Sequence, residues 1–318
     1  MKNEKQKNKI INCFYEGCIS GFGDFLRGSI HLYERCNSHG LDFDIDTKNH
    51  PISEFISTKH EGVVDKSEID CIPSEVLKES NMHFYKRVND FVYNKLCKAN
   101  GVDYIFSNFA YFLNVSQEHM INVVNMLPEL SDDCKKWFQE NIKFSDEIES
   151  IVQDKLKDLG LEPKKFDVIH FRLGDEVSFR EGIRPDYWVP DEDLCFKICD
   201  KILQGKDSDF PVVLMSDCNE VKEYIEEKAS ELNLPIHVLH LKSGHMQKQT
   251  DANKKYISDI EYSRENLLHT VLDMRLISLA DTVRSFSVYP WGSGFVTWIC
   301  KIYGVDFKVE RLKQIKNN

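Results

Sequence analysis

The chain has 318 residues, 42% of them hydrophobic and 11% aromatic, so it can bury sizeable cores. It exceeds the ~250–300 residues at which one core usually divides into two, so we expect two domains. The formal net charge of −11 argues against nucleic acid as a general partner, because binding to phosphate backbones needs a basic face. An anionic ligand would need a local basic pocket instead.

Cysteine usage and the N-terminus indicate the compartment. The ten cysteines are scattered and form no Cys-x-x-Cys pair, which favours buried, reduced thiols over disulfides or a zinc site. The charged N-terminus lacks the apolar stretch of a signal peptide, and no apolar run approaches ~18 residues. We therefore expect a cytoplasmic protein without a membrane span.

The first half of the chain alternates strands and helices around a polar region. We expect strands at Ile10–Glu16, Leu41–Ile45 and Asp103–Ser107, and helices at Asp24–Ser38, Gln117–Met126 and Asp146–Leu159. Residues 46–100 are predicted to be irregular, with short helical patches at 53–56 and 82–96. Gly160-Leu-Glu-Pro163 closes the last helix and is the predicted hinge, so the first domain is expected to span residues 1–160.

The second half predicts a parallel, doubly wound sheet. Strands are expected at Val168–Phe171, Val212–Met215, Ile236–Leu241, Val283–Val288 and Phe307–Val309, and helices at Asp191–Leu203, Asn219–Leu232, Ser263–Leu279 and Gly294–Ile302. The second domain is expected at 161–304, followed by a C-terminal tail at 305–318. Two Rossmann-like halves facing across a cleft would suit a nucleotide ligand.

The end of the strand that begins at Val168 carries a cluster of polar residues. The cluster contains His170, Arg172, Gly174 and Asp175. Ligands of open α/β sheets bind at the carboxyl ends of the strands, where a guanidinium can hold a phosphate with two parallel hydrogen bonds. The alternative is that Arg172 and Asp175 form only a surface ion pair.

Two further segments suit phosphate binding. Gly21 and Gly23 permit a tight turn before a helix N-terminus, although many such turns only connect a strand to a helix. Neither a dinucleotide fingerprint nor a P-loop is present. Near the C-terminus, Trp291-Gly-Ser-Gly294 opens a helix whose amides and Ser293 hydroxyl would suit a phosphate or a sugar hydroxyl. A helix cap with an aromatic plug is the alternative there.

Taken together, these segments resemble the fucosyltransferase superfamily, which includes α-1,2-, α-1,6- and protein O-fucosyltransferases. The matching residues are Gly21, Gly23, Asp24, Arg27, His170, Arg172, Gly174, Asp175, Asp217, Asp273, Ala280, Asp281, Ser293, Gly294 and Phe295. The matches keep the order and spacing of the family over residues 10–300, and residues 46–145 carry none.

The resemblance implies a GT-B fold with the donor in the C-terminal half. The implied reaction is inverting, metal-independent transfer of fucose from GDP-fucose to a hydroxyl of a glycan or protein acceptor, and no cofactor is expected. Arg172 would hold the β-phosphate beside His170, and Asp273 would meet the guanine or ribose. Ser293, Gly294 and Phe295 would contact the diphosphate. The other substrate-binding residues expected are Gly21, Gly23, Arg27, Gly174, Asp175, Asp217 and Trp291.

The candidates for the general base are Asp24 and Glu181, since members of the family differ in this residue and some have no clear base. We favour Asp24 because it would project from the acceptor side. No metal site is expected. Asp42, Asp44 and Asp46 alternate as D-x-D-x-D, which a short strand with exposed acids explains at least as well.

Two alternatives to a fucosyltransferase remain. The first is a GT-B enzyme that uses another nucleotide sugar, such as a different GDP-hexose, because nothing in the motifs reads the missing 6-hydroxyl of fucose. The second is a non-catalytic module of the same fold that binds a nucleotide or a glycan.

Overall fold

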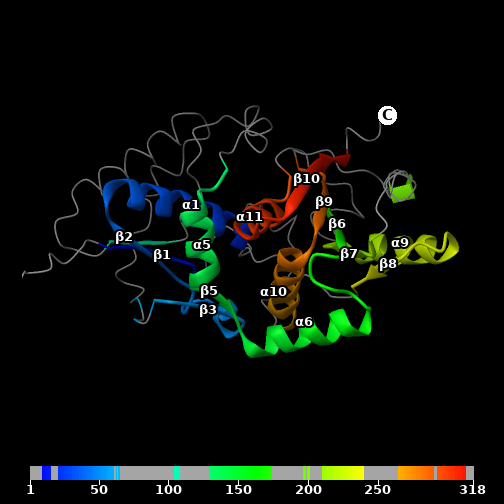
Figure 1. Cartoon of the computed structure of the whole chain (residues 1–318), viewed down its shortest axis with the longest axis horizontal. Coiled ribbons are helices and arrows are strands. Elements are labelled where there is room, and N and C mark those ends of the chain that lie inside the picture. The colour runs from blue at the N-terminus through cyan, green and yellow to red at the C-terminus, as the bar shows by residue number, and fades with distance from the viewer. Residues whose placement is uncertain are drawn as a thin grey trace, which may run out of the picture. The chain divides into compact units, whose positions relative to one another are not determined.

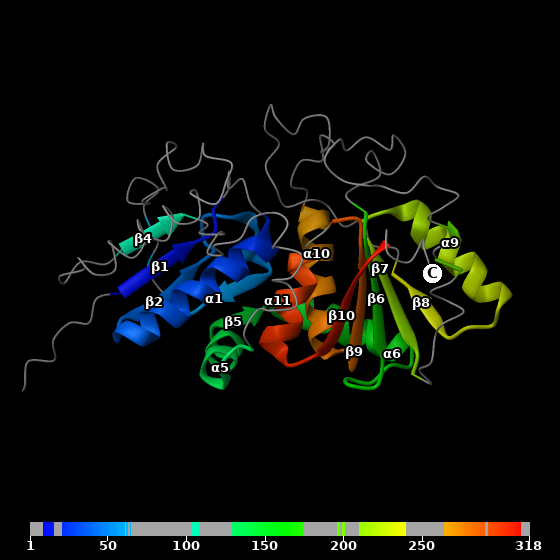
Figure 2. The same ribbon diagram turned by 90° about the horizontal axis from the view of Figure 1, so that it is seen from above.

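The computed structural model describes a chain that divides into two compact units, Met1–Lys143 and Phe144–Asn318 (Figures 1 and 2). The described residues are 9–15, 21–60, 62, 64, 104–107, 129–173, 196–197, 199–200, 210–239, 264–289 and 292–312. Both units combine helices with a parallel sheet, as predicted for an α/β protein. None of the helices in this part of the chain is both long and apolar enough to cross a membrane.

The first unit contains a three-stranded parallel sheet in the order β2-β1-β4. Its strands are β1 (Lys9–Cys13), β2 (Asp42–Asp46) and β4 (Tyr104–Ser107). The central strand β1 is buried from Ile10 onwards, as expected for a parallel strand covered on both faces. Asn12 is the polar residue in this buried run, and its Nδ2 donates to Ser29 Oγ at 2.8 Å.

Helix α1 (Phe22–His39) connects β1 to β2 and covers this sheet with an apolar face. The helix ends at Gly40, whose φ of 65° is the left-handed conformation that glycine adopts without steric cost. Phe14, just after β1, packs its ring 5.0 Å from Phe25 and 4.3 Å from His50. This aromatic cluster packs the end of β1 against α1 and His50.

Smaller elements complete the first unit, and the sequence patterns missed most of them. They are the 3-10 helix η1 (Pro51–Glu54), strand β3 (Ile56–Thr58), helix α5 (Asp132–Asn141) and strand β5 (Ile142–Phe144), which pairs with β3. The start of α5 is marked by Ser131, whose Oγ accepts from Cys134 N at 3.2 Å. A serine cap followed by two aspartates is a standard helix start, but the polar composition of α5 hides its apolar face.

The second unit contains a five-stranded parallel sheet in the order β10-β9-β6-β7-β8. Its strands are β6 (Asp167–Arg172), β7 (Val212–Ser216), β8 (Ile236–Val238), β9 (Thr282–Ser287) and β10 (Asp306–Arg311). Central β6 is flanked by β7 and β9, and the rings of Phe171 and Phe286 stack at 5.3 Å between their centroids. The predicted doubly wound sheet is therefore confirmed, with β10 as a full edge strand.

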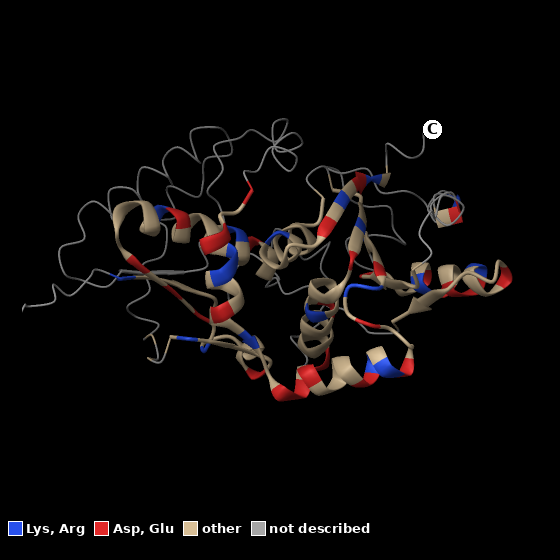
Figure 3. Cartoon of the chain, viewed as in Figure 1, with Lys and Arg blue, Asp and Glu red and all other residues tan. Residues whose placement is uncertain are grey.

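The helices of the second unit are α6 (Asp146–Asp158), α9 (Asn219–Glu231), α10 (Arg264–Leu279) and α11 (Gly294–Tyr303). Helix α6 has acids in its first turn and lysines in its last turn, which suits the helix dipole (Figure 3). Arg264 and Arg275 on α10 reach the start of α6, where they pair with Glu147 at 2.7 Å and Glu149 at 3.1 Å.

These contacts correct two expected domain limits. Because α6 packs on α10, the first unit ends at Lys143, before α6, whereas the sequence predicted an end at residue 160. Residues 306–311, expected in a C-terminal tail, form β10 and pair in parallel with β9. Residues 306–311 therefore belong to the sheet of the second unit, where they form the edge strand beside β9.

Candidate functional site

The candidate site lies at the carboxyl ends of β6, β7 and β9 in the second unit. Parallel strands bring their carboxyl ends to one edge of the sheet, where ligands of α/β proteins bind. The register places Phe171 opposite Ser216 on one side and Arg172 opposite Ser287 on the other. Residues from three distant parts of the sequence therefore meet around Arg172.

Arg172 is oriented by Asp217, the residue after β7. Arg172 Nη1 donates to Asp217 Oδ2, and the other carboxylate oxygen accepts from Leu173 N at 2.8 Å. The Asp217 side chain is 10% exposed, whereas that of Arg172 is 23% exposed and so remains open to solvent. A guanidinium has five N–H donors, so a contact with one carboxylate does not by itself exhaust its capacity to bind an anion.

Asp217 has contacts that the sequence did not predict. The sequence predicted Asp217 as a substrate-binding residue, and a surface pair of Arg172 with Asp175 was the alternative to a phosphate site. The structure pairs Arg172 with Asp217 across 45 positions of the chain, and Asp175 lies outside the described residues. Both carboxylate oxygens of Asp217 bind the chain around Arg172, so this carboxylate orients the guanidinium.

The loop after β9 packs beside Arg172. Val288 N donates to the Arg172 carbonyl at 3.1 Å, and the Arg172 guanidinium lies 5.8 Å from the centre of the Tyr289 ring. Gly292 N donates a hydrogen bond to the Tyr289 carbonyl at 3.1 Å, and the φ angle of Gly292 is 77°. A Cβ at Gly292 would stand 2.2 Å from Val309 Cγ1, so the turn requires glycine for two independent reasons.

Helix α11 starts directly after this turn, with Ser293 as its N-cap. Ser293 Oγ accepts from Val296 N at 3.4 Å, and Ser293 itself is buried. The amides of Gly294 and Phe295 occupy the first two helical positions, where a helix offers no internal acceptor. Both residues are partly exposed, so their N–H groups suit an anion from solvent.

His170 lies inside the sheet and has a structural partner. Its Nδ1 lies 3.1 Å from Ser285 Oγ on β9, and the residue is 8% exposed. Burial is the main cause that lowers the pKa of His170 to about 4, with Asp217 opposing the change and Arg172 contributing to it. The imidazole is therefore neutral near pH 7, so it offers hydrogen bonds but no positive charge to a phosphate.

We expect the protein to lose stability as the pH falls from 6.5 to 4. Burial also lowers the pKa values of His31 and His50 to about 4, below the ordinary value of 6.5. Because the folded pKa is depressed, the unfolded state binds more protons in this window, and the free energy of unfolding decreases with acidification. Urea unfolding at pH 7 and pH 5 measures the effect, and equal midpoints at the two pH values would contradict the buried, neutral histidines.

The predicted residues of the first unit lie at the start of α1. Gly21 is the N-cap, Gly23 and Asp24 fall in the first turn, and Arg27 Nη2 donates to Asp24 Oδ1 at 2.8 Å. The Asp24 side chain is 37% exposed and so remains accessible to a substrate. The structure thus brings Asp24 and Arg27 together, as an i,i+3 pair.

Other predicted residues are placed differently or lie outside the described chain. Asp273 is in the middle of α10 and is 8% exposed. The predicted residues that lie outside the described residues are Gly174, Asp175, Glu181 and Trp291.

The alternating acids of β2 have protein partners. Asp44 Oδ2 lies 3.5 Å from both Lys9 Nζ and His60 Nδ1, and Asp46 Oδ1 accepts from Lys48 N at 2.8 Å. Within the described ranges, no three or more His, Cys, Asp or Glu side chains are grouped as a metal site would require.

Sequence reasoning missed two contributors to the site, Ser285 and Tyr289. Ser285 stands opposite His170 in the β6–β9 register, and the serines at 285 and 287 alternate with Phe286 along the buried end of the strand. Small hydroxyl residues at alternate positions of a buried strand are the signal that could have been used. Tyr289 offered no comparable signal, because its contact with Arg172 depends on the path of the loop.

No protein-family model matches the chain, and no curated protein matches it in sequence. Several solved structures match it in fold. The fucosyltransferase NodZ from Bradyrhizobium has a TM-score of 0.50 at 14% identity, over 92% of each chain. The structure of NodZ α-1,6-fucosyltransferase soaked with GDP-fucose has a TM-score of 0.50 at 13% identity, and the match covers 93% of this chain and 92% of that one. A mutant of Arabidopsis thaliana FUT1 in complex with GDP gives 0.55 at 9% identity, over 97% of this chain and 71% of that one.

These similarities establish the fold. The chain folds like known fucosyltransferases over nearly its whole length, which confirms the predicted α/β, GT-B fold class.

Proposed function

We propose that this protein is an inverting, metal-independent fucosyltransferase that moves fucose from GDP-fucose to a hydroxyl of a glycan or protein acceptor. The observation that carries the proposal is the oriented guanidinium of Arg172, held by Asp217 at the end of the central strand of a fucosyltransferase-like fold. In this proposal the second unit binds the donor and the first unit faces the acceptor.

The chemistry of the leaving group supports this assignment. Negative charge builds on the departing GDP as the bond between C1 of the sugar and the phosphate oxygen breaks. A fixed guanidinium and the amides at the start of α11 would stabilise that charge more in the transition state than in the ground state. Asp217 and the cap at Ser293 hold these donors in place beforehand, so little reorganisation accompanies the reaction.

The acceptor must lose a proton in the same step. Inversion needs a base on the side of the sugar opposite to GDP, and we propose Asp24 for this role, with Glu181 as the other candidate. Exposure of Asp24 and its pairing with Arg27 support a carboxylate that is accessible and held in one orientation. The proton would pass from the acceptor hydroxyl to the carboxylate as the new C1–O bond forms.

GDP and GDP-fucose are expected to raise the melting temperature, whereas UDP-sugars and NAD are not. A ligand at 100 times its dissociation constant adds about 2.7 kcal/mol to stability, which gives a readable shift. A thermal-shift panel of nucleotides and nucleotide sugars measures this. The Arg172→Ala variant is the control, and it should lose most of the shift. Equal or greater stabilisation by UDP-sugars would refute the donor assignment.

Turnover is expected to survive EDTA. The proposed site holds the diphosphate with an arginine and helix amides, which replace the cation that many glycosyltransferases use. Release of GDP from GDP-fucose, assayed with and without the chelator, tests this expectation. Loss of turnover that Mn²⁺ or Mg²⁺ restores would contradict it, and Asp42, Asp44 and Asp46 would become candidates for metal ligands.

A further inference from the structure

The first unit contains a second concave site. It has a volume of about 620 Å³, within the ~300–1,000 Å³ typical of small-molecule pockets. Its lining combines aromatic and polar side chains, which come mainly from α1, β2, α5 and the segment after β3. The lining includes Tyr33, Phe43, Asp44, Lys59, His60 and Trp137.

This pocket is separate from the candidate donor site. It includes Lys9 and Asp42, the first residues of β1 and β2, which stand opposite each other in the register. The pocket therefore opens at the amino ends of these strands and beside β2, an edge strand. Gly21, Gly23 and Asp24 follow the carboxyl end of β1 in the chain, so the pocket lies at the opposite end of the sheet from them.

One wall of the pocket is aromatic. The ring of Trp137 lies 5.2 Å from that of Tyr33 and 5.1 Å from that of Phe43, measured between centroids. Phe138, the next residue on α5, packs against Trp137 at 4.9 Å. These neighbours fix the indole in place, and Trp137 is still only partly buried. A rigid, partly exposed indole offers a flat surface to C–H groups at little entropic cost.

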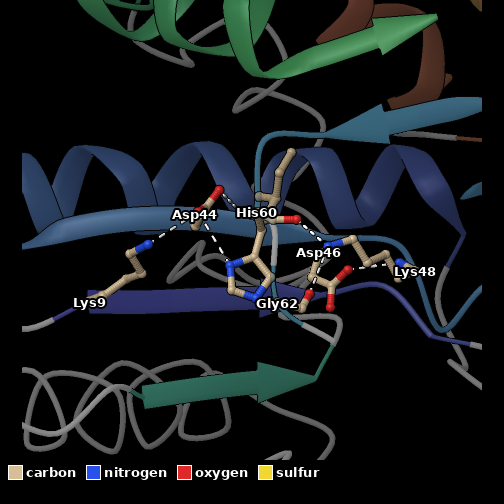
Figure 4. Close-up of polar contacts among 7 residues, drawn as sticks. Lys9, Asp44, Asp46, Lys48, His60 and Gly62 are labelled. Carbon is tan, nitrogen blue, oxygen red and sulfur yellow. Dashed lines mark hydrogen bonds and ion pairs between the residues drawn. The ribbon is translucent and has the colours of Figure 1, made fainter. Parts of the chain in front are cut away.

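The other wall is polar and balanced in charge. Asp44 accepts from Lys9 and lies beside His60, as Figure 4 shows. Together the lysines at 9 and 59 offset the aspartates at 42 and 44. A pocket with equal numbers of fixed positive and negative groups attracts neither anions nor cations, but it presents many hydrogen-bond donors and acceptors.

The chain segment that carries His60 is tied to the end of β2. Lys48 Nζ donates to the carbonyls of His60 and Gly62, the latter at 2.7 Å (Figure 4). Asn49 Nδ2 donates to the carbonyl of Val64 at 2.9 Å. These tethers build the polar wall before any ligand arrives, which reduces the entropy lost on binding.

We propose that this pocket binds a neutral saccharide. A sugar ring has C–H faces that pack on an indole and hydroxyls that both donate and accept hydrogen bonds. The pocket supplies the matching indole from Trp137, acceptors from Asp44 and donors from Lys59 and His60. The site would hold a glycan chain independently of the nucleotide, and it does not depend on the proposed transferase reaction.

The test measures binding of chitotriose, maltotriose, cellotriose and lactose to the full-length protein without nucleotide. Saturation-transfer NMR and tryptophan fluorescence give the dissociation constants. We expect saturable binding of at least one of these saccharides. Trp137→Phe and the exposed Lys59→Ala should each weaken it, by roughly three- to tenfold. Lys136→Ala, an exposed lysine beside Trp137 that does not line the pocket, should bind like the unmodified protein.

Three outcomes would overturn the proposal. They are absence of saturable binding by all four saccharides, unchanged affinity in both Trp137→Phe and Lys59→Ala, and tighter binding of fully deacetylated, cationic chitotriose than of chitotriose. Circular dichroism of each variant confirms that it is folded. Arg172→Ala separates the two sites, because it should lose GDP binding and keep saccharide binding, whereas the pocket variants should do the reverse.

Discussion

Arg172→Lys is expected to lose nearly as much turnover as Arg172→Ala, roughly 10²–10³-fold relative to the unmodified protein. Lysine keeps the positive charge but lacks the planar fork, so it cannot hold Asp217 and two phosphate oxygens at once. The loss should appear in kcat in addition to the weaker nucleotide binding, because charge on the leaving group is greatest in the transition state. Initial rates of GDP release from GDP-fucose, over a range of donor concentrations, provide the measurement.

Arg284→Lys is the matched control for this substitution. Arg284 lies on the neighbouring strand β9, where its Nε and Nη2 donate to the same oxygen of Glu310, Oε1, at 3.3 and 3.1 Å. Because only one acceptor atom is involved, a lysine can keep the ion pair. We expect this variant to keep near-normal turnover. If Arg172→Lys also retains close to full turnover, Arg172 is only an ion-pair partner of Asp217, and the donor-site proposal fails. Asp24→Asn and Glu181→Gln complete the set, since the general base should lose turnover and keep GDP binding.

Gly292→Ala is expected to destabilise the protein by roughly 2–5 kcal/mol. A left-handed φ costs a non-glycine residue about 1–2 kcal/mol, and overpacking against Val309 adds about 1–3 kcal/mol. A domain is stable by only about 5–15 kcal/mol, so this loss is large. Urea unfolding gives the value directly. The same substitution should weaken GDP binding, because Gly292 immediately precedes the cap of α11.

Two variants separate the causes of this destabilisation. Gly304→Ala has a similar φ of 63° but no atom within 4 Å of the added Cβ, so it should show the conformational cost alone. Combining Gly292→Ala with Val309→Ala removes the clash, so the double variant should be more stable than the sum of the single effects predicts. Equal costs at positions 292 and 304, with strict additivity, would show that the contact with Val309 relaxes freely.

The local patterns of the sequence were sufficient to predict most of the second unit. The apolar residues of β6 and the continuous apolar run of β7 identify buried parallel strands, and Ser293 before an apolar helix identifies the start of α11. These signals depend on residues a few positions apart, so they can be read without the tertiary structure. They place Arg172 at a strand end correctly. The polar helix α5 and the short strands β3 and β5 lack such signals and were missed.

The sequence by itself therefore determined the strands, the main helices and the position of Arg172 at the edge of a parallel sheet. Only the tertiary structure decided which groups surround it. Asp217 reaches Arg172 across 45 positions and Ser285 reaches His170 across 115, because the order of strands in the sheet brings β7 and β9 to either side of β6. The unit boundary and the pocket around Trp137 have the same origin. Each depends on contacts between side chains that are distant in the sequence and come together only when the elements pack. The local sequence pattern therefore carries no signal for them.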